Sequence, residues 1–157
     1  MKKKIKWIAF GLSVIIVTVV IYIGALVRYA ESEETALNTY RLSLEVMPEV
    51  DSVLTVHRFN GLESYVVALV ELTNHQEVYF FVRDGVVAHY IGRTELMSES
   101  QVISVASNLI TGGELHQTQL GIIEETPIFE VQMVLDGEMH YVIIHAVSGN
   151  VIMNFNL

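Results

Sequence analysis

The sequence predicts an α+β protein with an N-terminal transmembrane helix and two small tandem modules, each packing one helix on an antiparallel sheet. Three observations predict it. A long apolar stretch near the N-terminus carries no charge, the apolar period then changes from helical to alternating, and this order of helix and strands occurs twice. With 52% apolar and 17% charged residues, the composition excludes a disordered chain.

The apolar stretch that begins at Trp7 and ends at Val27 is predicted to be an uncleaved membrane anchor. A helix of that length, rising about 1.5 Å per residue, matches the roughly 30 Å hydrocarbon core of a bilayer. Lysines precede the stretch and glutamates follow it, so the N-terminus is expected in the cytoplasm. Residues 1–28 are then the lysine-rich start and the anchor, and the remainder lies outside. The alternative is a signal peptide cleaved after Ala30. Its apolar core would exceed the usual length of about 7–15 residues, and Arg28 would stand at the −3 position.

Residues 29–96 are predicted to form the first module. Its helix carries an apolar stripe at helical spacing and ends before Pro48. The stripe consists of Ala36, Tyr40, Leu44 and Met47. Short runs rich in Val, Tyr and Phe follow, separated by turn residues that include Asn60-Gly61 and Asp84-Gly85, so an antiparallel meander is predicted.

Residues 97–157 repeat this order as the second module. Ser98 and Gln101 are spaced for a capping box, and Gly112-Gly113 end the helix. Four runs with strand character follow, and the third resembles the third run of the first module. Because a unit of about 60 residues is marginally stable alone, the two modules are expected to share an interface.

Charge is divided unevenly along the chain. The lysines all lie within the first six residues, and residues 29–157 carry four arginines against 18 acidic residues, a net charge of −14. Such a surface does not favour binding to nucleic-acid phosphates or to anionic lipid. Solubility is the simplest reason for the charge, and electrostatic steering of a basic partner is the alternative.

No residue set indicates chemistry, so no catalytic, cofactor-binding or metal-binding residue is predicted. The chain has six histidines and no cysteine. His140 and His145 differ by an odd number on one predicted strand, so they point to opposite faces and do not converge on one ion. Ser148 lies three residues beyond His145 without the turn motif of a serine nucleophile. The chain is expected not to be an enzyme and to need no cofactor or small-molecule substrate.

The second module resembles a PepSY domain over most of residues 97–157. The resemblance rests on the helix start MSESQVISVA, on Phe129-Glu130-Val131, and on the closing hairpin YVIIHAVSGNV. Two positions depart from the family pattern, because His145 replaces the usual Asp and Ser148 replaces the usual Thr. A role that needs the Asp carboxylate, such as contact with a cation, is therefore not expected at this position.

The whole layout is similar to the TseB-type cell wall elongation regulators of Gram-positive bacteria. The resemblance implies a single-pass protein of the cell membrane that binds a membrane-bound penicillin-binding protein. PepSY modules elsewhere imply the alternative, a protease inhibitor or chaperone-like module at the cell surface.

The closing hairpin is the predicted place of contact. Tyr141 and Ile143 are expected to pack on the helix of the second module, and the opposite parity is expected to face outward or toward the first module. The candidate contact surface is therefore His140, Val142, Ile144 and His145. Because the run is apolar on both faces, the choice of buried face stays open.

Overall fold

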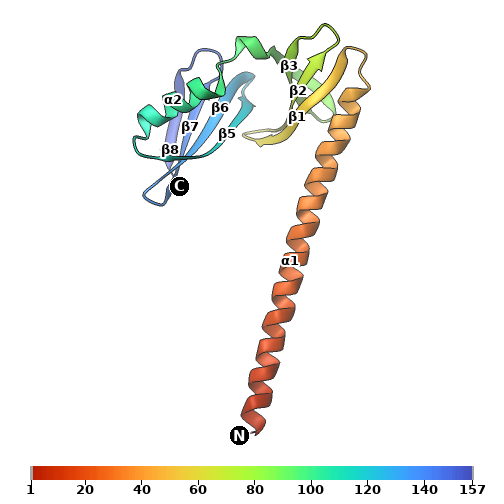
Figure 1. Cartoon of the computed structure of the whole chain (residues 1–157), viewed down its shortest axis with the longest axis vertical. Helices are drawn as coiled ribbons and strands as arrows, with labels where there is room; N and C mark the ends of the chain where they lie inside the picture. The colour runs from red at the N-terminus through yellow and green to blue at the C-terminus, as the bar shows by residue number, and fades with distance from the viewer. Residues whose placement is uncertain (1, 157) are drawn as a thin grey trace. The chain divides into compact units, whose positions relative to one another are not determined.

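A computed structural model describes the backbone of residues 2–156 and the side chains of residues 18–28 and 31–156. The chain divides into two compact units, residues 1–39 and residues 40–157. Figure 1 labels most of its elements. They are α1 (Lys2–Glu45), β1 (Val50–Asn60), β2 (Ser64–Leu72), β3 (Glu77–Arg83), β4 (Val86–Gly92), η1 (Arg93–Glu95), α2 (Glu99–Leu109), β5 (Glu114–Ile123), β6 (Thr126–Leu135), β7 (Glu138–His145) and β8 (Val151–Asn156).

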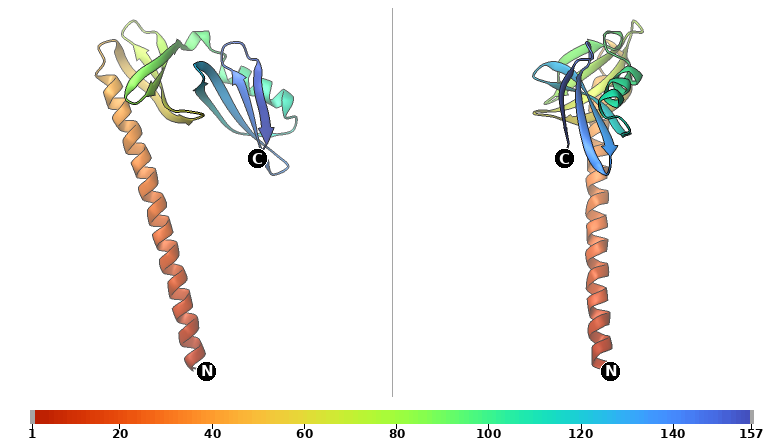
Figure 2. Two further views of the ribbon diagram at one scale, coloured as in Figure 1. Left: turned by 180° about the vertical axis from the view of Figure 1, so that it is seen from behind. Right: turned by 90° about the vertical axis from the view of Figure 1, so that its left-hand side faces the viewer.

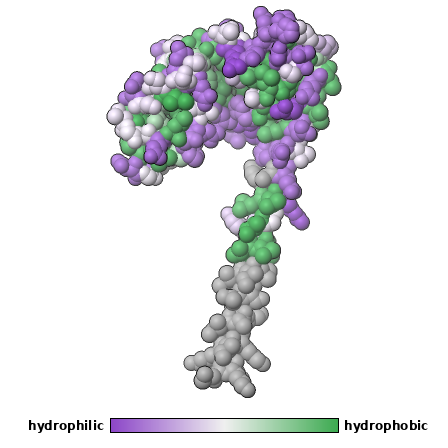
Figure 3. Space-filling view, in the orientation of Figure 1, coloured by the Kyte–Doolittle hydropathy of each residue, from purple (hydrophilic) through white to green (hydrophobic). Residues whose placement is uncertain are grey.

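The α1 helix is continuous from Lys2 to Glu45, whereas the sequence predicted an anchor followed by a separate helix of the first module. The chain continues as one helix because residues 28–45 contain neither proline nor glycine, and Pro48 follows its end. Figure 3 draws a hydrophobic segment of α1 in green, beside a stretch in grey. Among the described residues, no helix has an apolar run long enough to cross a bilayer. The first part of the predicted anchor, residues 7–17, lies outside the described side chains.

The first sheet has the strand order β1-β2-β3-β4, with every neighbouring pair antiparallel. Its strands and turns lie where the alternating pattern predicted them. The expected stripe is present, because Leu44 is buried and Ala36, Tyr40 and Met47 are half-buried. Arg41 Nη1 adds one bond to the carbonyl oxygen of Val53, at 2.8 Å. The last turn of α1 therefore contacts the first sheet.

The second sheet has the order β5-β6-β7-β8 and does carry a packed helix. Figures 1 and 2 show α2 lying along this sheet. The predicted capping box is present, since the Ser98 side chain accepts from the Gln101 backbone and the Gln101 side chain accepts from the Ser98 backbone. Val102 and Ala106 of α2 are fully buried, whereas Leu109 is 48% exposed. The second module thus has the predicted architecture.

The two sheets share one hydrophobic core, as expected for units of this size. Buried residues of the first sheet, including Phe59, Val67 and Phe81, belong to the same cluster as α2 and the strands of the second sheet. The Phe59 ring lies against Gly121 so closely that a Cβ there would approach it to 2.4 Å. Gly121 is therefore required by space at the junction of the two sheets.

Candidate functional site

The structure corrects the expected orientation of the closing hairpin. Val142 and Ile144 are completely buried, so they do not belong to an exposed contact surface. Val142 pairs with Val131, and the nearby Met133 side chain approaches Ile110 at the end of α2 around Gly113. We call this the helix side of the second sheet. It carries Val131, Met133, His140, Val142 and Ile144.

The opposite side faces the first sheet at one end and is open at the other. We call it the joint side, because Gly121, Ile128 and His145 lie on it in register and Gly121 meets Phe59. Tyr141 and Ile143 lie on the joint side as well. The sequence predicted that these two residues pack on the helix of the second module, so the observed packing is the reverse. The sequence left the choice open because Val142 and Ile143 are equally apolar, and only the position of α2 decides between them.

His140 and His145 lie on opposite sides of the sheet, as their odd separation predicted, and both are half-buried. His145 Nδ1 accepts hydrogen bonds from the backbone N–H groups of Val147 and Ser148, each at 3.2 Å. An aspartate carboxylate closes turns in the same manner. His145 therefore stabilises the turn between β7 and β8 through its ring nitrogen.

The β8 strand is an edge strand with apolar side chains exposed on both of its faces. It pairs with β7, and its other edge meets no strand within the described residues. Ile152 is 52% exposed, Met153 54% and Phe155 39%, and the Phe155 ring stacks on Tyr141 at 5.1 Å between centroids. No residue of β8 is charged. Edges of this kind are templates for pairing with another chain.

A groove of about 880 Å³ lies on the first sheet. Its floor is apolar and comes from β2, β3 and β4, and its rim is polar and mainly acidic. The floor residues are Leu72, Val78, Phe80, Val87 and Tyr90. Tyr90 is 75% exposed, although it is a large aromatic residue opposite Phe80 in the sheet register. The sequence did not reveal this groove, because its residues come from three strands and from the turn after β4.

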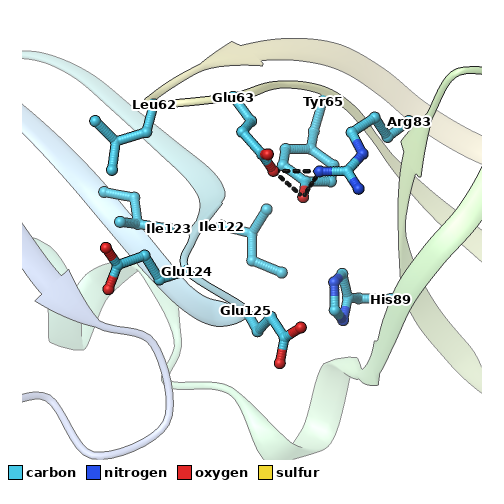
Figure 4. Close-up of a pocket in the computed structure, with 9 residues that line it drawn as sticks. All are labelled: Leu62, Glu63, Tyr65, Arg83, His89, Ile122, Ile123, Glu124 and Glu125. Carbon is cyan, nitrogen blue, oxygen red and sulfur yellow. Dashed lines mark hydrogen bonds and ion pairs between the residues drawn. The ribbon is translucent and has the colours of Figure 1, made fainter.

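A smaller cleft of about 420 Å³ lies between the first sheet and the β5–β6 turn. Figure 4 shows Glu63, Tyr65 and Arg83 joined by hydrogen bonds at one end of this cleft, with His89 and Glu125 opposite. The Tyr65 hydroxyl donates to Glu63 at 2.8 Å, Arg83 also donates to Glu63, and the Arg83 guanidinium lies 5.6 Å from the centre of the Tyr65 ring. The three side chains tie the β1–β2 turn to the end of β3.

The electrostatics of this triad favour its present protonation state. The hydrogen bond from Tyr65, followed by the charge of Arg83, lowers the pKa of Glu63. Burial, followed by the bond to Glu63, raises the pKa of the Tyr65 phenol. The carboxylate thus stays charged and the phenol stays protonated at neutral pH, so this group forms a clamp in which each member has a partner.

His57 lies at the junction of the sheets and is part-buried. Its Nε2 is 2.9 Å from the carbonyl oxygen of Leu120, which accepts only, so Nε2 carries the proton. Burial lowers the pKa of His57, and the bond to Leu120 opposes that shift to a smaller degree. His57 is therefore neutral at neutral pH and links the two sheets through one hydrogen bond. Among the described residues, no three His, Asp or Glu side chains are grouped to hold a metal ion.

No family model and no curated protein matches this chain. Among solved structures, the YpmB protein from Bacillus subtilis matches with a TM-score of 0.65 and 15% identity, covering 76% of this chain and 96% of that one. A candidate lipoprotein from Clostridium difficile matches with a TM-score of 0.41 and 11% identity, covering 82% of this chain and 92% of that one. The second similarity is too weak to define a common fold. The chain therefore shares the fold of YpmB.

Proposed function

We propose that this chain is a non-enzymatic, membrane-anchored regulator of cell wall elongation that binds a penicillin-binding protein close to the membrane. The observation that carries the proposal is the exposed apolar surface on both sheets, formed by β8 and by the groove of the first sheet. Exposed apolar patches with polar surroundings are typical of protein-binding surfaces.

The class of partner comes from the resemblance to TseB-type regulators. The layout of a lysine-rich start, an apolar stretch and two small modules is similar to theirs, and the closing hairpin resembles that of PepSY domains. The similarity to YpmB shows a common fold only, because the two chains are 15% identical. It says nothing about the activity of this chain.

The proposed location follows from the charge pattern. Lysines before an uncharged apolar stretch favour an N-terminus in the cytoplasm, with residues 29–157 outside the cell membrane of a Gram-positive bacterium. An anchored protein meets membrane-bound partners at high effective concentration, so a modest contact area is sufficient for binding.

Crosslinking in living cells tests this function. A photoreactive amino acid at Met153, which is 54% exposed on β8, is expected to capture a penicillin-binding protein. The same group at Glu114, exposed on the opposite edge strand β5, is the matched control. If neither Met153 nor Tyr90 in the groove captures a wall synthase above the background at Glu114, the proposal is wrong.

The second candidate function is a PepSY-type protease inhibitor or chaperone-like module. The open edge of β8 favours it, because an inhibitor strand that extends a protease's sheet binds through main-chain hydrogen bonds. The full chain in detergent, added to the host's secreted proteases, distinguishes the two functions. Hydrolysis at an unchanged rate counts against inhibition.

A further inference from the structure

The two sheets follow one plan, and their equivalent faces are covered differently. The third strands correspond, with Tyr79, Phe80, Phe81 and Val82 in β3 matching Tyr141, Val142, Ile143 and Ile144 in β7. Phe80 is thus the counterpart of Val142, which is completely buried on the helix side of the second sheet. The groove lies on the Phe80 side of the first sheet, which corresponds to the helix side of the second sheet.

The cover on this face of the first sheet is incomplete at β4, because Val78 and Phe80 of β3 are 7% exposed whereas Tyr90 of β4 is 75% exposed. Leu44 is buried at 1% exposure, and Arg41 bonds to Val53 of β1. The half of the face over β3 and β4 keeps the groove, with Tyr90 largely exposed at its edge. An aromatic residue beside an apolar floor is a typical anchor in protein interfaces.

The rim of the groove is negatively charged. Glu49, Glu77 and Glu95 line it, together with Arg93 and His75. Arg93 is already paired with Glu77, and His75 lies 3.1 Å from Glu71. The remaining carboxylates of Glu49 and Glu95 therefore set the sign of the field that an approaching segment meets.

We propose that this groove takes an amphipathic helix of a partner protein, with an apolar stripe toward Phe80 and Tyr90 and lysine or arginine toward the glutamate rim. The template is α2, whose Val102, Ala106 and Ile110 fill the equivalent face at i, i+4 and i+8. A helix satisfies its own backbone, so it fits a sheet face better than an extended strand does. The inference deepens the proposed function by assigning its contact to one face of one sheet.

A binding assay on the full chain in a maltoside detergent tests this proposal. The chain has no cysteine, so Gln76→Cys at the groove accepts one polarity-sensitive dye. The probe is a synthetic peptide of about four helical turns, with leucines on one face and lysines on the other. A matched control peptide has glutamate in place of every lysine. The lysine peptide is expected to shift the dye emission to the blue and to saturate.

Two further variants locate the contact. Tyr90→Ser removes an exposed anchor and is expected to weaken binding of the lysine peptide by about tenfold or more, as interface aromatics do. Leu115→Ser, a truncation at an exposed position on β5, is expected to leave binding unchanged. Glu49→Gln with Glu95→Gln is expected to weaken binding and to flatten its dependence on salt. Far-UV circular dichroism checks that each variant is folded.

Three results overturn the proposal: no saturable binding of the lysine peptide, equal binding of the glutamate peptide, or unchanged binding by Tyr90→Ser. A blue shift that grows with the concentration of the labelled chain alone also overturns it, since a second copy then fills the groove. Crosslinking to a wall synthase in cells is a separate readout. If β8 is the contact, crosslinking succeeds even when the groove binds no helix. Failure of the peptide-binding assay is therefore distinguishable from failure of the proposed function.

Discussion

The second sheet has its own capped helix and the first sheet does not, although both follow the same strand order. Val142 and Ile144 are completely buried on the helix side of the second sheet, whereas the corresponding face of the first sheet keeps a groove beside Tyr90. The first sheet compensates through its other face, where Phe59 and Phe81 enter a core shared with the second. The first sheet thus buries one face in the shared core and most of the other, where the strand β4 alone leaves a large aromatic residue, Tyr90, exposed.

The largest effect is expected from Phe59→Ala. Phe59 is 2% exposed in the shared core, so its loss is expected to lower the free energy of unfolding by about 3–5 kcal/mol. Urea denaturation measures the change, and hydrogen exchange locates it in β2 and β6 together. Phe155→Ala, an aromatic truncation at 39% exposure, is the control and should cost about 1.5 kcal/mol or less. Lost protection in β2 with full protection in β6 would show that the sheets are stabilised separately.

Gly121→Ala tests the same junction by adding an atom. The new Cβ would come within 2.4 Å of the Phe59 ring, so a destabilisation of about 1–3 kcal/mol is expected. Phe59→Leu in the Gly121→Ala chain makes room and should recover part of that loss, which a double-mutant cycle measures. Additive effects of the two changes would contradict direct packing between them.

Ser98→Ala examines the feature that the first sheet lacks. It removes the side chain that caps α2 and should cost about 1 kcal/mol, because an orphan backbone N–H loses its acceptor. Thermal denaturation followed by circular dichroism measures the loss. Ser104→Ala, at an exposed position within the same helix, should be neutral or slightly stabilising. Equal losses in both variants would mean that the cap does not stabilise α2.

The smallest expected effect is a pH dependence at the junction. Burial lowers the pKa of His57 below its ordinary 6.5, so the unfolded chain binds the proton more tightly than the folded chain. Stability from this residue is complete above about pH 6.5 and falls as the pH drops from there toward the lowered pKa. His57→Gln keeps an N–H donor for Leu120 without titrating. The wild-type chain should lose more stability than this variant between pH 7 and pH 5, and parallel losses would contradict the assignment.

Strands and turns were predictable because they depend on local pattern. Alternating apolar residues and the turns at Asp84-Gly85 and Asp136-Gly137 define the hairpins, and the Ser98 capping box defines the start of α2. The continuous α1 was missed because the change in hydropathy after Val27 resembles a boundary. Helix formers on both sides of that change carry the helix through it.

The candidate site was predictable only in part. The uncharged run Val151–Asn156 is visible in the sequence, and its exposure follows from its place at a sheet edge. The buried parity of β7 depends on which face α2 covers, and that is a long-range contact. The groove depends on how β2, β3, β4 and the turns beside them pack together, and no single stretch of sequence carries that information.

The central claim is that this chain acts by protein contact at the membrane, and co-purification from detergent-solubilised membranes tests it most directly. The wild-type chain is expected to enrich a penicillin-binding protein, identified by mass spectrometry, and Tyr90→Ser or Met153→Asp is expected to reduce that enrichment while Glu114→Gln does not. Equal recovery of that protein with all four chains, or its absence from the wild-type preparation, would contradict the account.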